Sequence, residues 1–186
     1  PPRVTTGEAP IGVTVTVPEI LYLRTVENID VTITLADLGA KTEDLSISDI
    51  GGGVYETQTG ATANGTDGVS ITSPFSAGAT EGTAQIDKTV PNVYAIWSNT
   101  AAEGGITVDV RVTDGVLDLG ETLEAAEITD VITSIDGKEG ANVTGIEVPG
   151  LVTPKVGDVT LTIDLKGTQT AGEYTTGEIT VEASLP

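Results

Sequence analysis

The chain alternates apolar and polar residues with a period of two over several segments. Valine, isoleucine or leucine takes every second position there, and the positions between them are mostly threonine. Such a period places the apolar side chains on one face of a β-strand, while β-branched threonine suits the opposite, exposed face. The pattern predicts strands over residues 11–17, 29–35, 106–112, 159–165 and 179–185.

Turn-forming residues separate these strands. The 23 glycines and 9 prolines gather in short clusters, for example at residues 51–53, 63–68, 102–105 and 136–140. We therefore expect an all-β protein of about ten strands, folded as one antiparallel β-sandwich domain over residues 19–186. Only residues 122–129 have a helical pattern, and residues 1–18 form an N-terminal extension.

The N-terminal extension carries the most regular of the alternating segments. Its apolar residues are Ile11, Val13, Val15 and Val17. Pro18 follows at once, and because proline cannot donate a hydrogen bond to a strand ladder, the chain changes direction or partner there. The segment either closes its own domain or leaves it to fill a groove in a neighbouring molecule, as in strand addition to an open sheet edge.

The charge of the chain excludes two classes of partner. Acidic residues number 28 against 8 basic ones, which gives a net charge of −20. Nucleic acids and anionic lipid surfaces need clustered lysine and arginine, so neither is expected as a partner. Such acidity otherwise indicates a well solvated surface, calcium binding or life in high salt.

Acidic residues are densest between residues 109 and 130. The candidate cation ligands in this segment are Asp109, Asp114, Asp118 and Glu121. Calcium favours several oxygen ligands that converge from a loop, but the segment lacks the alternating Asp/Asn pattern with a central glycine that marks a calcium loop. Calcium is the one cofactor that the composition leaves open.

Little in the sequence could perform catalysis. The chain has no histidine and no cysteine, which removes the usual general base, thiolate nucleophiles and the common zinc ligands. Two carboxylates could hydrolyse a glycoside, but such clefts also supply aromatic platforms, and aromatic residues are only 3% here. We expect no enzymatic activity. Trp97 is either a platform for sugar stacking or a side chain that fills the core between two sheets.

The sequence contains no targeting or membrane-spanning segment. It has no run of about 18 apolar residues and no basic start followed by an apolar stretch. Because it starts with Pro1-Pro2-Arg3 and contains no methionine, we expect a mature, processed form of an exported protein.

The two ends of the chain resemble a known family. The alternating N-terminal segment, the absence of catalytic residues, the acidic composition rich in threonine, glycine and valine, and the terminal AGEYTTGEITVEASLP (residues 171–186) are similar to bacterial pilins of the chaperone–usher type. The resemblance is to the archaic branch related to spore coat protein U. It implies an incomplete immunoglobulin-like sandwich, which the N-terminal donor strand of the next subunit completes.

The resemblance assigns roles to two sets of residues and names partners. Ile11, Val13, Val15 and Val17 would be the donor residues. The strand at the edge of the acceptor groove would carry Ile179, Val181, Ala183 and Leu185. The protein would be a non-enzymatic subunit of an extracellular pilus that polymerises with itself, head to tail, aided by a periplasmic chaperone and an usher.

The alternative function is a monomeric extracellular β-sandwich that binds a ligand. It would be stabilised by calcium through the acidic segment or would bind carbohydrate through Trp97.

Overall fold

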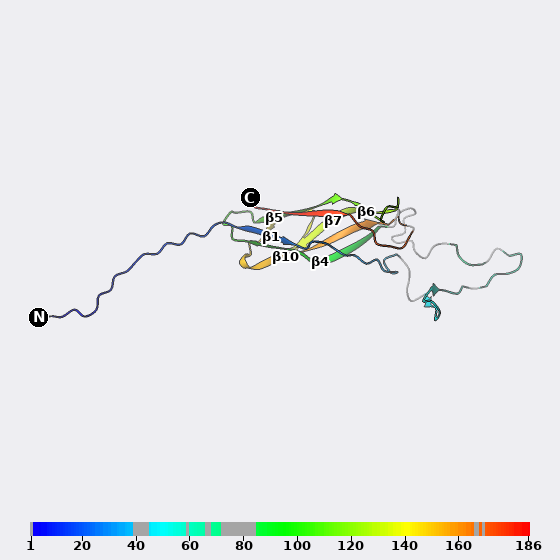
Figure 1. Ribbon diagram of the computed structural model, residues 1–186, viewed down its shortest axis with the longest axis horizontal. Helices are drawn as coiled ribbons and strands as arrows, with labels where there is room; N and C mark the ends of the chain where they lie inside the picture. Colours follow the sequence, from blue (N-terminus) through cyan, green and yellow to red (C-terminus); the bar gives the residue numbers. More distant parts are fainter. Residues whose placement is uncertain are drawn as a thin grey trace.

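The computed structural model describes residues 2–38, 45–58, 60–65, 68–71, 85–165, 168 and 170–186. Within these residues the protein is all-β, without a helix, and every strand pairing is antiparallel (Figure 1). The strands are β1 (Leu21–Thr25), β2 (Ser46–Ile47), β3 (Val54–Tyr55), β4 (Gln85–Ser98), β5 (Ile106–Asp114), β6 (Val116–Asp118), β7 (Ala125–Ile135), β8 (Lys138–Gly140), β9 (Asn142–Ile146), β10 (Gly150–Asp164) and β11 (Glu178–Ser184).

Two sheets form the body of the protein. The larger sheet has the order β1-β4-β10-β7-β6, with β8 paired to β7, and the smaller one has the order β11-β5-β9. Strands β5 and β9 of the smaller sheet contact β7 of the larger one. The separate hairpin of β2 and β3 forms a third, two-stranded sheet. The main body is therefore a β-sandwich of antiparallel sheets.

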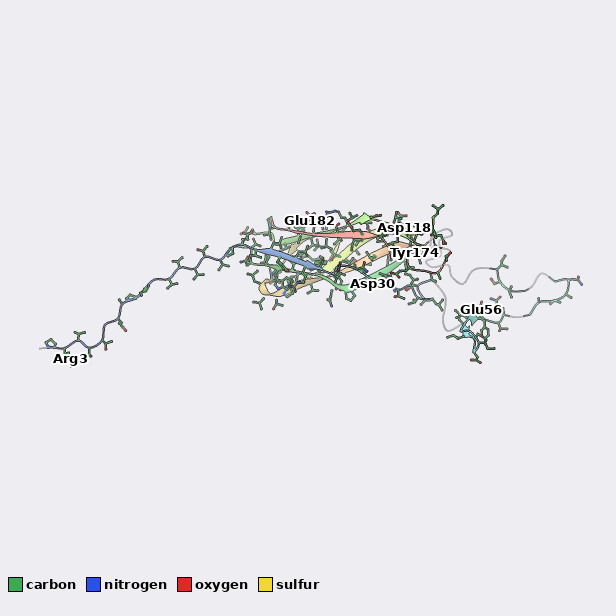
Figure 2. All side chains as sticks on the ribbon, viewed as in Figure 1. Arg3, Asp30, Glu56, Asp118, Tyr174 and Glu182 are labelled. Atoms are coloured by element: carbon green, nitrogen blue, oxygen red, sulfur yellow. The ribbon has the colours of Figure 1, made fainter. Side chains whose placement is uncertain are left out.

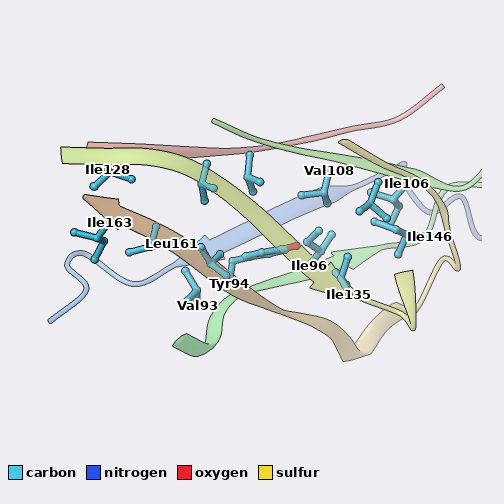
Figure 3. Close-up of a cluster of buried hydrophobic side chains, with 14 of the residues drawn as sticks. Val93, Tyr94, Ile96, Ile106, Val108, Ile128, Ile135, Ile146, Leu161 and Ile163 are labelled. Carbon is cyan, nitrogen blue, oxygen red and sulfur yellow. The ribbon is translucent and has the colours of Figure 1, made fainter. Parts of the chain in front are cut away.

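The hydrophobic core lies between these two sheets (Figure 3). The larger sheet supplies Tyr94 and Ile96 from β4 and Leu161 from β10, and the smaller sheet supplies Ile106 and Val108 from β5, all at most 5% exposed. On each strand these residues alternate with more exposed ones, as period-two segments require. Burial of this face is the main source of stability.

Tyr94 requires a glycine in the neighbouring strand, β10. Its ring lies directly over Gly157 of β10, where an added Cβ atom would lie 2.0 Å from the ring carbon Cζ. The Tyr94 hydroxyl is hydrogen bonded to the hydroxyl of Thr133, which is itself fully buried. Glycine at position 157 is therefore required by close packing between β4 and β10, and the register of the two strands shifts directly after it.

The structure confirms most of the expected strands and corrects others. Strands cover 106–112, 179–185 except its last residue, and most of 159–165. The expected helix at 122–129 is wrong, because a turn precedes Ala125 and β7 begins there. Ala126 and Ile128 are buried while Glu127 and Thr129 are exposed, so this segment also has a period of two.

The segment 29–35 is not a paired strand either. No ladder forms there, although Ile29, Val31 and Ile33 are partly buried and pack against the core. The alternation of residue types correctly indicated that these three side chains face inward, but Leu35 is exposed, and alternation did not indicate whether the backbone has a partner.

A tight turn joins β7 to β8 and is stabilised by charge. Asp136 and Gly137 both have positive φ angles, 54° and 71°, which suit a two-residue hairpin turn. The Asp136 carboxylate accepts hydrogen bonds from the Lys155 ammonium at 2.7 Å and from the Glu147 backbone N–H at 2.9 Å. The Lys155 bond, followed by that of Glu147, lowers the pKa of Asp136 from 3.8 to about 2.

We predict that Asp136→Asn removes a pH-dependent part of the stability. A carboxylate with a lowered pKa in the folded state stabilises the fold above its unfolded pKa of 3.8, and this contribution is lost as the pH falls towards 2. Asparagine keeps the turn geometry, since it also tolerates positive φ. The melting temperature should fall by a few degrees at pH 7, and the difference from the unmodified protein should disappear near pH 2. A difference that stays constant over this range would contradict the prediction.

Candidate functional site: an exposed arm and an open sheet edge

Residues 2–20 form an extended arm outside the body of the protein. The arm contains no strand, and it projects away from the sandwich with Arg3 near its far tip (Figures 1 and 2). Ile11, Val13, Val15 and Val17 are 86%, 82%, 78% and 64% exposed. The strand expected at 11–17 is therefore unpaired in the single chain, and it does not close its own domain.

Exposure of the apolar side chains of this arm to water is unfavourable. Four aliphatic side chains on one face of an extended segment form a continuous apolar surface, and large exposed surfaces of this kind commonly mark interaction sites. The polar threonines between them, Thr14 and Thr16, belong to the opposite face. The arm thus has the side-chain pattern of a β-strand without a sheet to join.

The root of the arm is fixed to the body by Asn99, the residue directly after β4. The Asn99 side-chain amide donates a hydrogen bond to the Pro18 carbonyl at 2.8 Å, and its carbonyl oxygen accepts one from the Ile20 N–H at 2.7 Å. The Asn99 backbone N–H donates in turn to the Ile20 carbonyl. These bonds extend the β1–β4 pairing to residues that precede the start of β1. The body therefore sets the direction in which the arm leaves.

The sandwich has an open edge between its two sheets, which β1 and β11 border. Among the described residues, each of these strands has one hydrogen-bonded neighbour, β4 for β1 and β5 for β11. The two strands contact each other across the sheets. Within this part of the chain, each therefore leaves one row of backbone N–H and C=O groups without a strand partner.

The apolar side chains at this open edge are only partly covered. The four residues predicted at the edge of an acceptor groove, Ile179, Val181, Ala183 and Leu185, are partly buried and pack against the core. Leu21 and Leu23 of β1 are in the same state. The core is thus less well covered along this edge than at its centre, where side chains such as Ile96 and Ile106 are fully buried.

The outer face of the smaller sheet is polar. Arg111 of β5 makes ion pairs with Asp109 and with Glu182 of β11, each at 3.2 Å. The threonine hydroxyls of Thr113 and Thr180 are hydrogen bonded on the same pair of strands. The apolar side chains of β11 and these polar ones therefore lie on opposite faces of the strand.

The four candidate cation ligands are not brought together as a metal site. Asp109 is paired with Arg111, the Asp114 carboxylate accepts the Val116 N–H, and Asp118 accepts the Thr176 hydroxyl. In the part of the chain that the structure describes, no group of three or more acidic, histidine or cysteine residues could hold a metal ion. Glu121 lies in the exposed turn before β7.

Trp97 lies on the outer face of the larger sheet, not in the core. Its neighbour along β4, Ile96, points into the core, while Trp97 pairs with Tyr22 of β1, with the ring centroids 5.7 Å apart. The Arg24 guanidinium lies 4.8 Å from the Trp97 ring centroid and 5.6 Å from that of Tyr22. Ile20, Tyr22, Arg24, Trp97 and Leu151 line an open hollow of about 380 Å³.

The interpretation of Trp97 as a filler between the sheets is wrong, and its role as a glycan platform stays a prediction. Arg24 covers part of the ring face that a sugar would use. The sequence analysis missed Tyr22, Arg24 and Asn99. Alternation along β1 and β4 places Tyr22 and Arg24 on the outer face beside Trp97, but only the register of the two strands brings them together.

We predict that Asn99→Ala frees the root of the arm. The variant loses both side-chain hydrogen bonds to Pro18 and Ile20, each worth about 1 kcal/mol. Nuclear magnetic resonance relaxation of the Ile20 amide should then report fast motion like that of the arm, whereas in the unmodified chain it should match the rigid sheet. Unchanged relaxation at Ile20 would mean that the backbone ladder holds the root without Asn99.

Comparisons with known proteins do not place this chain in a family. No protein-family model matches the sequence, and neither the curated proteins nor the solved structures give a match. Over its described residues, the chain has no helix with the length and apolar character needed to cross a bilayer. The arm, its root and the open edge are the most distinctive features of the described residues.

Proposed function

We propose that this protein is a non-enzymatic structural subunit of an extracellular filament, polymerised head to tail by donor-strand insertion. The observation that carries the proposal is the match between the arm and the open edge. The apolar segment of the arm, 11–17, is seven residues long, and β11 is also seven residues long. Four apolar side chains alternate along the arm, and four alternate along β11 and the residue after it.

The order of the strands supports an incomplete immunoglobulin-like sandwich. Under this proposal β1, β4, β7 and β10 take the places of strands A, B, D and E, and β5 and β11 take those of C and F. This assignment follows the order of the strands along the chain. The last strand, G, would lie beside β11, and the described part of the chain has no strand there. The arm of a neighbour would occupy this place.

The energy of such a joint is sufficient for a durable filament. Burial of four aliphatic side chains contributes about 1.5–3 kcal/mol each, before the costs of association. The backbone groups of the arm and of β11 would pair in a ladder, which satisfies both at once. The arm and the open edge are different surfaces. Two joined subunits therefore still have one free arm and one free edge, and the contact propagates as an open chain.

The family resemblance is the basis for the proposed extracellular location and for the proposed assembly partners. A subunit with a free arm and an open edge would aggregate or insert prematurely, so its edge needs cover until assembly. A periplasmic chaperone would provide this cover and an usher would exchange it for the next arm.

We predict that Val15→Asp abolishes polymerisation and leaves the fold intact. Val15 lies in the middle of the donor segment, where an inserted carboxylate would be buried without a partner at a cost of several kcal/mol. A denaturing gel of native material, run with and without boiling, should show a ladder that collapses to one band near 18.9 kDa only on boiling. The Val15→Asp variant should show the single band in both lanes.

Thr16→Asp is the matched control. It adds the same charge one position away, on the face of the arm that would point out of the groove, so its ladder should persist. Loss of the ladder in both variants would mean that charge on the arm, and not the apolar face, decides assembly. A single band from the unmodified protein would favour the monomeric binding module.

We predict that an arm peptide stabilises a chain without its arm. A peptide of residues 9–19, added at 100 times its dissociation constant to a chain that begins at residue 19, should raise the melting temperature by about 5–10 °C. The same peptide with Val15→Asp should have no effect. Equal stabilisation by both peptides would contradict insertion of the apolar face.

A further inference from the structure

The outer face of the larger sheet, beside the arm's root, presents a second surface for contact between subunits. We propose that the hollow lined by Ile20, Tyr22, Arg24, Trp97 and Leu151 receives Leu123 of the neighbouring copy of this chain, in whose edge the arm is inserted. This inference rests on the proposed function. It assigns an occupant to an aromatic and cationic surface that strand insertion leaves unused.

The bodies of two joined subunits would lie very close together. Val17 is the last donor residue, and the carbonyl of the next residue, Pro18, is held by Asn99. One extended residue spans about 3.3–3.6 Å, so almost no slack separates the inserted segment from the body that carries it. The neighbour must therefore lie directly against the surface around the root, where Ile20 and Trp97 are found.

The direction of strand pairing decides which end of the neighbour lies against the root of the arm. All strand pairings in the described body are antiparallel, and an arm that pairs with β11 in the same way brings Val17 next to Glu178, where β11 begins. This end carries β6 and, with Asp118 and Tyr174, lies opposite to the arm (Figures 1 and 2). The turn between β6 and β7, residues 119–124, belongs to the same end.

The two surfaces are also chemically complementary. Leu123 in this turn is 105% exposed, which makes it the most exposed large apolar side chain of the described chain. Residues 114–124 and 173–178 contain six acidic residues and no lysine or arginine. The hollow offers apolar walls and the Arg24 guanidinium, which contacts two aromatic rings and forms no ion pair with the described residues. An apolar side chain framed by carboxylates fits apolar walls beside a cation.

Trp97 is the only tryptophan of the protein, so its fluorescence reports on the hollow directly. The experiment measures acrylamide quenching of Trp97 in assembled filaments and in the monomeric Val15→Asp variant, with the gel ladder as an independent measure of assembly. Leu123→Ser tests the proposed occupant. Ile50→Ser is the matched control, because Ile50 is 89% exposed on the separate hairpin of β2 and β3.

We expect filaments of the unmodified chain and of Ile50→Ser to show a quenching constant roughly half that of the monomer or less, because a contact that excludes water also excludes the quencher. Leu123→Ser should give the same gel ladder with quenching close to that of the monomer. If the unmodified chain forms a full ladder but its Trp97 is quenched as strongly as in the monomer, this inference alone is overturned. Continued protection of Trp97 in Leu123→Ser filaments would overturn the assignment of Leu123, and absence of any ladder would overturn the proposed function and the inference with it.

Discussion

The structure depends above all on one backbone constraint, which is that in the described part of the chain β11 has a hydrogen-bonding partner on one side only. The core needs β11, since Ile179 and Val181 pack against it, yet these side chains stay partly exposed. Fully closed sandwiches protect their edge strands or cover the core beside them. Here the same chain carries an apolar segment of equal length that has no place in its own fold. The unpaired edge of β11 in one molecule and the unpaired apolar segment of another would satisfy each other if they paired.

The chemistry of the surface agrees with a structural role. Several basic side chains form ion pairs on the outer faces, as Arg111 does with Asp109 and Glu182, and as Lys155 does with Asp136, although the chain keeps a net charge of −20. The described residues do not gather acidic side chains into a metal site. What remains distinctive is apolar: the arm, the open edge and the aromatic hollow at the root. These are the surfaces on which the proposed assembly rests.

The fold could be predicted from the sequence where a side-chain period alone decides it. The strands around Val108, Leu161 and Val181 follow from alternation, and so does the inward direction of Val31, although its backbone is unpaired. The hydrogen bonds of Asn99 could not be predicted, because they join positions 79 and 81 residues apart. Trp97 shows the same limit. Its residue type indicated a core filler or a binding surface; alternation with the buried Ile96 places it on the outer face, and only the register with β1 brings Tyr22 beside it.

The continuity of the arm with β1 has a mechanical consequence. Tension along a filament would enter each subunit at Leu21 and act along the axis of β1, which pairs with β4 through five successive residues. A pull along the strand loads all of these hydrogen bonds together in shear, whereas a pull across the strand would break them one after another. The arm's root, with its bonds to Asn99, extends the loaded region by two residues. In the proposed filament, the attachment point would therefore lie where a small number of hydrogen bonds resists the greatest force.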